Sequence, residues 1–201
     1  MAHAHAYLPA AGQRWLLPLY DPLVALFSRE RKWRGAILDA LDLKPNDVLI
    51  DVGCGTGTLA IMAKTRVPQV KVIGIDPDPD ALARSQAKAK RKGADVTFLQ
   101  GFGNDVARLA GAGQATKVVS SMAFHHMPHD MQRASMAAIH EALAPGGRLV
   151  IADFIGGHFG GAAEDHLTGD LAATGFGNVR TLQRFRAFLS DAVLIAAEKA
   201  R

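Results

Sequence analysis

The 201-residue chain has very little of several residue types, and each shortage excludes a class of protein. Its one cysteine, Cys54, rules out an internal disulfide, so we predict a reducing compartment, the cytoplasm. Only two tryptophans and two tyrosines occur, and no basic stretch is interleaved with aromatic residues, so we expect no nucleic-acid partner. The longest apolar run, residues 15–27, is broken by two prolines and an aspartate and is too short to span a bilayer.

The overall composition is that of a globular protein with a sizeable core. Apolar residues make up 49% of the chain and charged residues 21%. The net charge of +4 favours anionic surfaces without indicating a particular partner. We expect an N-terminal helical segment over residues 1–45 and one ligand-binding domain over residues 46–201.

Residues 48–57, with the sequence VLIDVGCGTG, organise the rest of the chain. The apolar, β-branched run at its start is typical of a strand buried on both faces. Gly53, Gly55 and Gly57 follow at alternate positions, and a helical pattern begins at Thr58. Glycines let the backbone turn sharply and approach a ligand, and a helix start offers unpaired N–H groups. The stretch therefore predicts a nucleotide-binding site.

The charge beside the glycines indicates which nucleotide binds. The dinucleotide pattern G-x-G-x-x-G fails from Gly53, although Gly55-x-Gly57-x-x-Ala60 fits its looser form and keeps an NAD-dependent oxidoreductase as an alternative. Asp51, two residues before the first glycine, would repel a pyrophosphate and attract an ammonium or a sulfonium. That is the ligand profile of S-adenosylmethionine.

The pattern Asp51-x-Gly53-x-Gly55-x-Gly57 resembles the first motif of the class I S-adenosylmethionine-dependent methyltransferases. The resemblance runs from residue 48 to the C-terminus. Residues 123–128 and the turn at residues 143–147 resemble the later motifs of the ubiquinone/menaquinone-biosynthesis methyltransferases. The resemblance implies a methyl transfer from S-adenosylmethionine. A non-catalytic module that binds S-adenosylmethionine or a lipid stays open as a third reading.

Strand and helix patterns alternate along the chain, which predicts an α/β fold with right-handed crossovers and a parallel sheet. By resemblance, we expect a single doubly wound, mostly parallel seven-stranded sheet with an antiparallel C-terminal edge and an N-terminal helical lid. Helices are predicted at residues 21–41, 58–64, 79–92, 129–143 and 163–174; strands are predicted at 48–52, 70–75, 95–100, 117–122, 148–154, 177–185 and 192–198.

Cofactor residues are expected at the ends of the strands. Asp76 lies 19 residues after Gly57 at the tip of the second strand, where a carboxylate usually binds ribose hydroxyls. Residues 101–105 depart from the family, which commonly has an acidic residue there; Phe102 is expected to flank the adenine, with Asn104 or Asp105 as its polar partner. The predicted cofactor-binding set is Asp51, Gly53, Cys54, Gly55, Gly57, Asp76, Pro77, Phe102, Gly103 and Ser120. The Cys54 side chain is interpreted as a small loop filler rather than a nucleophile.

His125 and His126 follow the fourth strand directly and are the predicted catalytic residues. Their pKa range suits proton removal from an acceptor at neutral pH. His126 is slightly favoured, because a helix-capping role is less natural one residue before Met127-Pro128; such a structural role for one of the pair stays open. We expect no metal, since adjacent histidines cannot easily share one ion and no helical pair of histidines at ligand spacing is present.

The methyl acceptor must be recognised outside the shared core, by residues 1–45 and 155–166. Both segments are short, which favours a small molecule over a protein. Apolar residues 15–27 and the basic residues after them favour a lipophilic acceptor, such as a lipid or a quinone precursor. The helix at residues 21–41 is either a packed helix with a solvated basic face or a lid that contacts the inner membrane surface. The predicted substrate-binding residues are Tyr20, Phe27 and Asp153.

Overall fold

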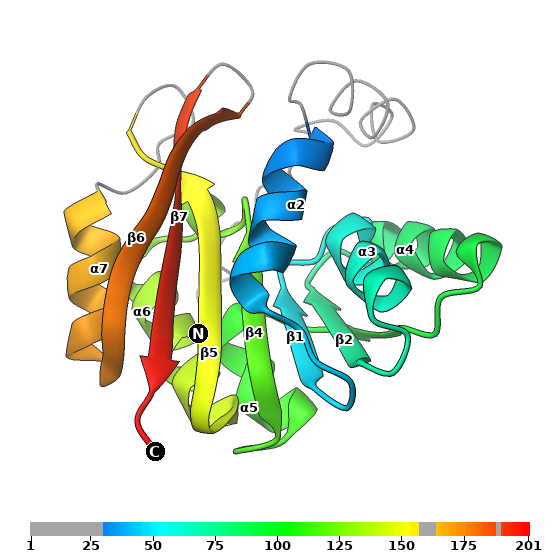
Figure 1. Ribbon diagram of the computed structural model, residues 1–201, viewed down its shortest axis with the longest axis horizontal. Helices are drawn as coiled ribbons and strands as arrows, with labels where there is room; N and C mark the ends of the chain where they lie inside the picture. Colours follow the sequence, from blue (N-terminus) through cyan, green and yellow to red (C-terminus); the bar gives the residue numbers. More distant parts are fainter. Residues whose placement is uncertain (1–29, 157–163, 188–189) are drawn as a thin grey trace, which may run out of the picture.

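The computed structural model describes residues 30–156, 164–187 and 190–201 (Figure 1). Its helices are α2 (Glu30–Leu41), α3 (Thr58–Arg66), α4 (Pro79–Lys92), α5 (Val106–Ala110), α6 (His129–Ala142) and α7 (Glu164–Ala173). Its strands are β1 (Val48–Val52), β2 (Lys71–Asp76), β3 (Thr97–Gln100), β4 (Ala115–Ser121), β5 (Leu143–Phe154), β6 (Phe176–Ala187) and β7 (Ser190–Lys199). Short 3₁₀ turns, η2 (Gly103–Asp105) and η3 (Phe124–His126), follow β3 and β4.

All seven strands form one sheet in the order β3-β2-β1-β4-β5-β7-β6. Strands β1 to β5 pair in parallel, and β7 is antiparallel to both β5 and β6. The chain winds outward from β1 to β3 and then returns to place β4 on the other side of β1. The prediction of a doubly wound sheet with an antiparallel C-terminal edge is therefore confirmed.

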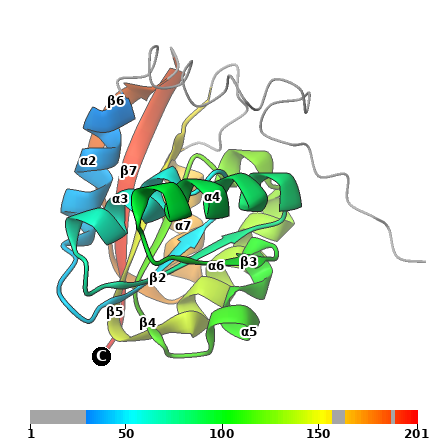
Figure 2. The ribbon, with the colours of Figure 1, turned by 90° about the vertical axis from the view of Figure 1, so that its right-hand side faces the viewer.

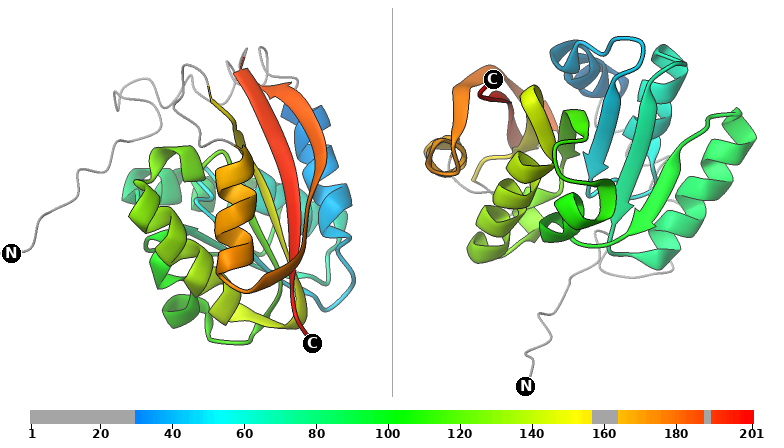
Figure 3. Two further views of the ribbon diagram at one scale, coloured as in Figure 1. Left: turned by 90° about the vertical axis from the view of Figure 1, so that its left-hand side faces the viewer. Right: turned by 90° about the horizontal axis from the view of Figure 1, so that it is seen from below.

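Helices cover both faces of the sheet (Figures 2 and 3). On one face α2 and α3 pack through residues such as Ile37, Leu41 and Leu59. On the other face α6 and α7 pack through residues such as Met136 and Leu167. Strands β1 and β2, in the middle of the parallel part, are buried on both faces along most of their length. The core thus lies in two layers, and only the two ends of the parallel strands open toward loops.

Helix α4 has the bounds that its sequence predicts, and its ends show why. Asp78 accepts hydrogen bonds from the backbone N–H groups of Asp80 and Ala81 at 2.8 and 3.4 Å, and Pro79 occupies the first helical position. Gly93 ends the helix in the left-handed conformation, with φ at +62°. These local signals do not depend on the rest of the fold, so the sequence alone was sufficient to predict where α4 begins and ends.

In helix α2, one of the basic side chains is turned toward the sheet rather than toward solvent. Arg31 and Lys32 are exposed as expected for a solvated basic face, but the Arg34 side chain is only 17% exposed. Its position, one turn before Ile37 and Leu38, puts it on the stripe that faces the sheet. Arg34 therefore lies apart from the exposed basic residues of this helix. None of the described helices combines the length and the apolar character that crossing a membrane requires.

Two further elements differ from expectation. The turn at residues 144–147 is part of β5, because the pairing of Ala115 with Leu143 and of Lys117 with Arg148 brackets it as an irregular bulge. Helix α5 was not predicted, since five residues carry too little periodicity to be recognised. The predicted helix start at residue 21 and the substrate residues Tyr20 and Phe27 lie outside the described residues, so the lid and its membrane contact stay predictions.

Removing the N-cap of α4 tests how much this helix start contributes to stability. We expect Asp78→Ala to lower the free energy of unfolding by about 1 kcal/mol, because two N–H groups lose their acceptor. Urea unfolding followed by circular dichroism measures the difference. Gln86→Ala, at an exposed position within the same helix, is the control and should change stability by much less. Equal effects of the two substitutions would contradict the capping role.

Candidate functional site

The carboxyl ends of β1, β2, β4 and β5 meet at one edge of the sheet, where the strand order reverses between β1 and β4. Open α/β sheets bind ligands at such a reversal. The glycine loop follows β1, Asp76 ends β2, and residues 120–126 and Asp153 come from β4 and β5. The structure therefore brings most of the predicted site residues to one region.

The three glycines of the loop after β1 serve different purposes. All have positive φ, at +71°, +52° and +72° for Gly53, Gly55 and Gly57. A Cβ on Gly53 would lie 2.4 Å from the Cβ of Ala123, and one on Gly57 would lie 2.8 Å from the Cβ of Ser85. A Cβ on Gly55 would meet nothing within 4 Å. Gly53 and Gly57 are thus required by packing, whereas Gly55 faces open space above the loop.

Hydrogen bonds tie the glycine loop to β2. The backbone N–H groups of Gly53 and Cys54 both donate to the carbonyl oxygen of Ile75, at 2.8 and 3.1 Å. The Cys54 thiol is buried and lies where a side chain on Gly74 would have to be, 2.9 Å from that Cβ position. Burial, with Asp51 and Asp76 nearby, raises the pKa of this thiol well above its ordinary value. The side chain fills the loop, as the sequence analysis proposed.

Asp76 is buried at the end of β2 and organises the loop. Its Oδ2 accepts the Gly55 N–H at 2.8 Å, and its Oδ1 accepts the Asp78 N–H at 3.0 Å. Burial raises its pKa, and these two backbone donors oppose the rise. Each carboxylate oxygen can accept a second hydrogen bond. Asp76 therefore retains accepting capacity next to the open side of Gly55.

Asp51 is the most unusual group of the site. Its side chain is 1% exposed, yet its Oδ2 has no hydrogen-bond partner within the described part of the chain. Burial raises its pKa from 3.8 to about 7, opposed by the charge of Arg34 and by a backbone hydrogen bond from Ala60, while Asp76 adds to the rise. An orphaned buried carboxylate oxygen calls for a donor, and a ligand ammonium fits that requirement.

The loop after β3 holds itself together. Asp105 Oδ2 accepts the Phe102 N–H at 3.0 Å, and Asp105 Oδ1 accepts from Arg108 at 2.9 Å, so this carboxylate is already engaged. The Phe102 side chain is 41% exposed. A Cβ on Gly103 would lie 2.4 Å from the Ser135 hydroxyl, which explains the glycine by packing. An adenine-flanking role for Phe102 stays a prediction.

Two other predicted cofactor residues are bonded within the protein. The Pro77 carbonyl accepts from the Gln100 side chain at 3.2 Å. The Ser120 hydroxyl is fully buried and donates to the Val52 carbonyl at 2.9 Å, which joins β4 to β1. Both lie beside the glycine loop, and their contact with a cofactor stays a prediction.

Asp153 and His125 form a buried pair at the ends of β5 and β4. Asp153 Oδ1 lies 2.6 Å from His125 Nδ1, and the His125 side chain is 4% exposed. The same carboxylate accepts the N–H groups of Phe124 and Phe154, both at 2.7 Å. A carboxylate accepts hydrogen bonds, so His125 directs Nδ1 to Asp153, and Nε2 is the ring nitrogen that stays available to another partner. Asp153 thus orients His125; its predicted contact with substrate stays a prediction.

His126 lies against this pair. Its ring centroid is 3.9 Å from that of His125. Partial burial, with a smaller contribution from His125, lowers the pKa of His126 below its ordinary value, so its ring is neutral at pH 7. The segment begins at Met122, which has a φ of +55°. A non-glycine residue in this region is strained, and such strain is concentrated at functional sites.

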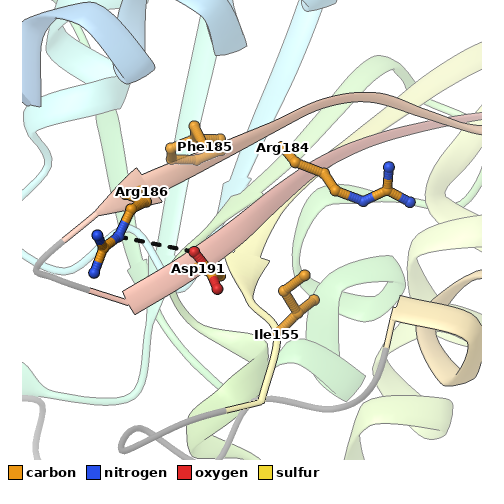
Figure 4. A pocket seen from close by; sticks show the side chains of 5 residues that line it. All are labelled: Ile155, Arg184, Phe185, Arg186 and Asp191. Atoms are coloured by element: carbon orange, nitrogen blue, oxygen red, sulfur yellow. Dashed lines mark ion pairs between the residues drawn. The ribbon is translucent and has the colours of Figure 1, made fainter.

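A pocket of about 340 Å³ opens where β5 ends beside the tips of β6 and β7 (Figure 4). Its lining residues are Ile155, Arg184, Phe185, Arg186 and Asp191. Arg186 lies 3.8 Å from Asp191, and Arg184 pairs with Glu164 of α7 at 2.8 Å. The sequence does not predict this pocket, because the residues of β6 and β7 show only the pattern of edge strands. Among the described residues no group of three or more side chains suits a metal ion.

Comparisons with known proteins agree with this geometry. Residues 49–147 match the family described as "Methyltransferase domain". The chain is 35% identical over 142 residues to the demethylmenaquinone methyltransferase of Thermus thermophilus. The aligned region covers 69% of this chain and 62% of that protein. It is also 33% identical over 159 residues to the ribosomal RNA small subunit methyltransferase C of Pseudomonas aeruginosa. This aligned region covers 74% of this chain and 47% of that protein. The chain thus spans only part of the length of either relative.

The fold also matches solved structures. Geranyl diphosphate methyltransferase in complex with S-adenosylmethionine superposes with a TM-score of 0.71 at 18% identity, covering 84% of this chain and 85% of that one. At this identity the likeness concerns the fold alone.

The buried carboxylate of Asp51 makes the stability of the ligand-free protein depend on pH. Because its pKa is higher in the folded than in the unfolded state, the stability it contributes is full below about pH 4 and is lost as the pH rises toward 7. Asp51→Asn removes this loss. From pH 5 to pH 8 we expect the variant to gain roughly 3 kcal/mol of unfolding free energy relative to the wild type. Urea unfolding at several pH values measures it.

The control for this experiment is Asp95→Asn, which removes an exposed carboxylate from the turn before β3. Its unfolding free energy should follow the pH profile of the wild type. If the Asp51→Asn profile ran parallel to the wild type as well, the carboxylate could not be desolvated as described.

Proposed function

Because the chain belongs to the class I S-adenosylmethionine-dependent methyltransferases, we propose that it transfers a methyl group from S-adenosylmethionine to a small acceptor at the carboxyl edge of its sheet. The observation that carries the proposal is the unpartnered Asp51 oxygen beside the glycine loop. The cofactor supplies a methyl group already activated on a positively charged sulfur, together with an ammonium. A negative group is well matched to such a ligand and poorly matched to a pyrophosphate.

The residues around the loop fit the remaining parts of the donor. Asp76 keeps accepting capacity for the two ribose hydroxyls. Gly55 leaves open space above the loop, which is available to the donor molecule. The exposed ring of Phe102 follows β3, next to β2 in the sheet, and supplies an apolar surface for the adenine. Together these features hold the donor and exclude water from it, which is most of what this reaction asks of a protein.

The Asp153–His125 pair supplies a base for acceptors that must lose a proton. The carboxylate fixes the tautomer and orientation of the imidazole, so Nε2 is the proton acceptor. A positioned base of this kind contributes roughly 10²–10⁴-fold to a rate. This geometry favours His125 over His126 as the base, which reverses the order favoured by sequence alone. His126, whose ring lies against that of His125 at an interplanar angle of 41°, then forms part of the wall beside the acceptor.

The acceptor is a hydroxylated aromatic or quinone-type molecule. The pocket at the tips of β6 and β7 combines the apolar side chains of Ile155 and Phe185 with the charged groups of Arg186 and Asp191, which suits a flat apolar molecule with a polar substituent. Its volume of about 340 Å³ is that of a small-molecule site. The demethylmenaquinone methyltransferase relative supports this class of acceptor. The ribosomal RNA methyltransferase relative supports RNA as the alternative.

Binding and turnover test the proposal in two steps. In calorimetry, S-adenosylmethionine and S-adenosylhomocysteine should bind and NAD should not. With S-adenosylmethionine carrying a labelled methyl group, we expect label in reduced quinone precursors and none in ribosomal RNA. NAD binding instead would support the oxidoreductase, label in RNA would replace the acceptor class, and cofactor binding without label in any acceptor screened would support the non-catalytic module.

The base is tested by substitution. We expect His125→Gln to lower turnover by about 10²-fold or more with little change in affinity for S-adenosylmethionine, because proton removal is lost while the donor site is intact. Asp153→Asn should have the same direction and shift the pH dependence of kcat. His129→Gln, an exposed histidine paired with Asp170 on α6 and α7, is the control. A larger loss with His126→Gln than with His125→Gln would contradict the assignment.

A further inference from the structure

Helix α6 buries two polar side chains among apolar ones. Gln132 is 6% exposed and Ser135, three residues later, is fully buried, whereas other buried residues of the helix, such as Met136 and Ile139, are apolar. A buried polar side chain costs free energy unless it is hydrogen-bonded, so its partners indicate its role. Both side chains contact residues 124–127, the segment that carries the two adjacent histidines and is called the histidine turn below.

The Gln132 amide holds the histidine turn at both ends. Its Nε2 donates to the carbonyl oxygen of Phe124 at 2.9 Å and to that of Met127 at 3.1 Å. A side-chain amide nitrogen has two hydrogens, and here each has an acceptor. The Ser135 hydroxyl adds a contact to the Met127 sulfur at 3.7 Å. One side chain of α6 thus joins the first and the last residue of the turn.

The bond to Phe124 orients a carbonyl that already has a partner. Within the turn, this oxygen accepts the Met127 N–H at 2.9 Å. Gln132 therefore occupies its second lone pair. On the other side of the same residue, the Phe124 N–H donates to Asp153 Oδ2 at 2.7 Å. The residue directly before His125 is thus held by α6 through its carbonyl and by β5 through its amide.

The position of the turn decides where the His125 ring lies. Asp153 Oδ1 is 2.6 Å from His125 Nδ1, while Oδ2 of the same carboxylate holds the Phe124 N–H. A shift of the turn would therefore move the imidazole relative to its carboxylate. The segment also follows Met122, whose φ of +55° is a strained conformation that persists only where the surroundings hold it. Gln132 is one of the groups that hold it.

We propose that Gln132 is a positioning residue for the methyl transfer: its amide fixes the histidine turn, so that His125 keeps Nδ1 on Asp153 and Nε2 toward the acceptor. The inference rests on the proposed function, because it requires His125 to take a proton from the acceptor. Gln132 acts through His125 and touches neither donor nor acceptor. Helix α6 is thereby part of the catalytic arrangement rather than only a cover for the sheet.

A double-mutant cycle tests whether Gln132 acts through His125. Gln132→Met removes both donor hydrogens and keeps an unbranched side chain. With labelled S-adenosylmethionine and a reduced quinone precursor, we expect kcat to fall about 10–100-fold, because small displacements of a reacting group cost this much. The KM for S-adenosylmethionine should change less than about 2-fold. In a chain that already carries His125→Gln, Gln132→Met should lower kcat less than about 2-fold, since no base is left to position.

Gln114→Met is the matched control, because it makes the same chemical change at an exposed amide. Gln114 donates to the Ala112 carbonyl at 3.5 Å in the turn before β4, at the opposite end of that strand from the histidine turn. It should leave kcat unchanged both in the wild type and in the His125→Gln chain.

Gln132→Glu gives a second readout with a defined sign. A carboxyl group donates one hydrogen bond when protonated and none when ionised. Turnover of the wild type should rise with pH as its base loses a proton. Turnover of Gln132→Glu should rise and then fall, because ionisation of the new carboxyl replaces a donor with a charge facing two carbonyl oxygens. This pH profile also decides the matter if circular dichroism shows that Gln132→Met does not fold.

Nitrogen NMR of the imidazole needs no acceptor. The His125 signals are assigned by their loss in His125→Gln. We expect the signals of a single tautomer in the wild type and in Gln114→Met, and signals averaged between tautomers in Gln132→Met, because the ring no longer keeps Nδ1 on Asp153.

The outcomes separate this inference from the proposed function. An equal loss of kcat from Gln132→Met with and without His125 would show a purely structural role and overturn the inference. Unchanged kcat or unchanged imidazole signals in Gln132→Met would overturn it as well. If His125→Gln left turnover intact, the proposed base itself would be refuted, and the positioning role with it.

Discussion

The burial of one carboxylate, Asp51, is the constraint on which the rest of the site depends. An ionised group removed from water without its full set of hydrogen bonds costs several kcal/mol. The protein offsets part of this cost with an amide of α3 and with the charge of Arg34. The rest of the cost is not offset, because Asp51 Oδ2 has no hydrogen-bond partner among the described residues. The end of β1 therefore carries, next to the glycine loop, a buried acceptor that the described residues leave unsatisfied.

The strand order then separates two chemical environments within one edge of the sheet. On the side of β1 and β2 the side chains are hydrogen-bond acceptors: Asp51 Oδ2 has no partner among the described residues, and Asp76 Oδ2 accepts from Gly55. On the side of β4 and β5 the Asp153 carboxylate orients the imidazole of His125. The reversal between β1 and β4 puts these environments next to each other. The fold itself thus brings the buried carboxylates of β1 and β2 and the Asp153–His125 pair to one end of the parallel strands.

What sequence reasoning could predict follows from how local the signals are. The ends of α4 are set by Asp78, Pro79 and Gly93 within one segment, and β1 is defined by an apolar run with glycines after it. Asp153 and His125 are 28 residues apart in the sequence, so only the register of β4 on β5 brings them together. Sequence therefore identified both residues but assigned them to different roles.

Arg34 illustrates a second limit. Several basic residues crowd the start of α2, and any of them can be read as part of a solvated face. The phase of the helix is fixed by Ile37, Leu38 and Leu41 at its other end, and projecting that stripe back by one turn reaches residues 33 and 34. The helical periodicity thus places Arg34 on the buried face. A positive charge there is unfavourable unless a buried carboxylate lies opposite to it, and the sequence does not show that Asp51 does. That pairing is tertiary information.

Packing requirements weaken the evidence for a dinucleotide-binding loop. The pattern Gly55-x-Gly57-x-x-Ala60 matches a dinucleotide loop at three positions, but two of them have packing reasons. Gly57 has no room for a Cβ beside Ser85 and Phe98, and Ala60 is fully buried between α3 and the sheet. These residues let a helix approach a strand closely, which any nucleotide-binding loop of this type requires. Only the charge next to the loop distinguishes the ligands, and that charge belongs to Asp51.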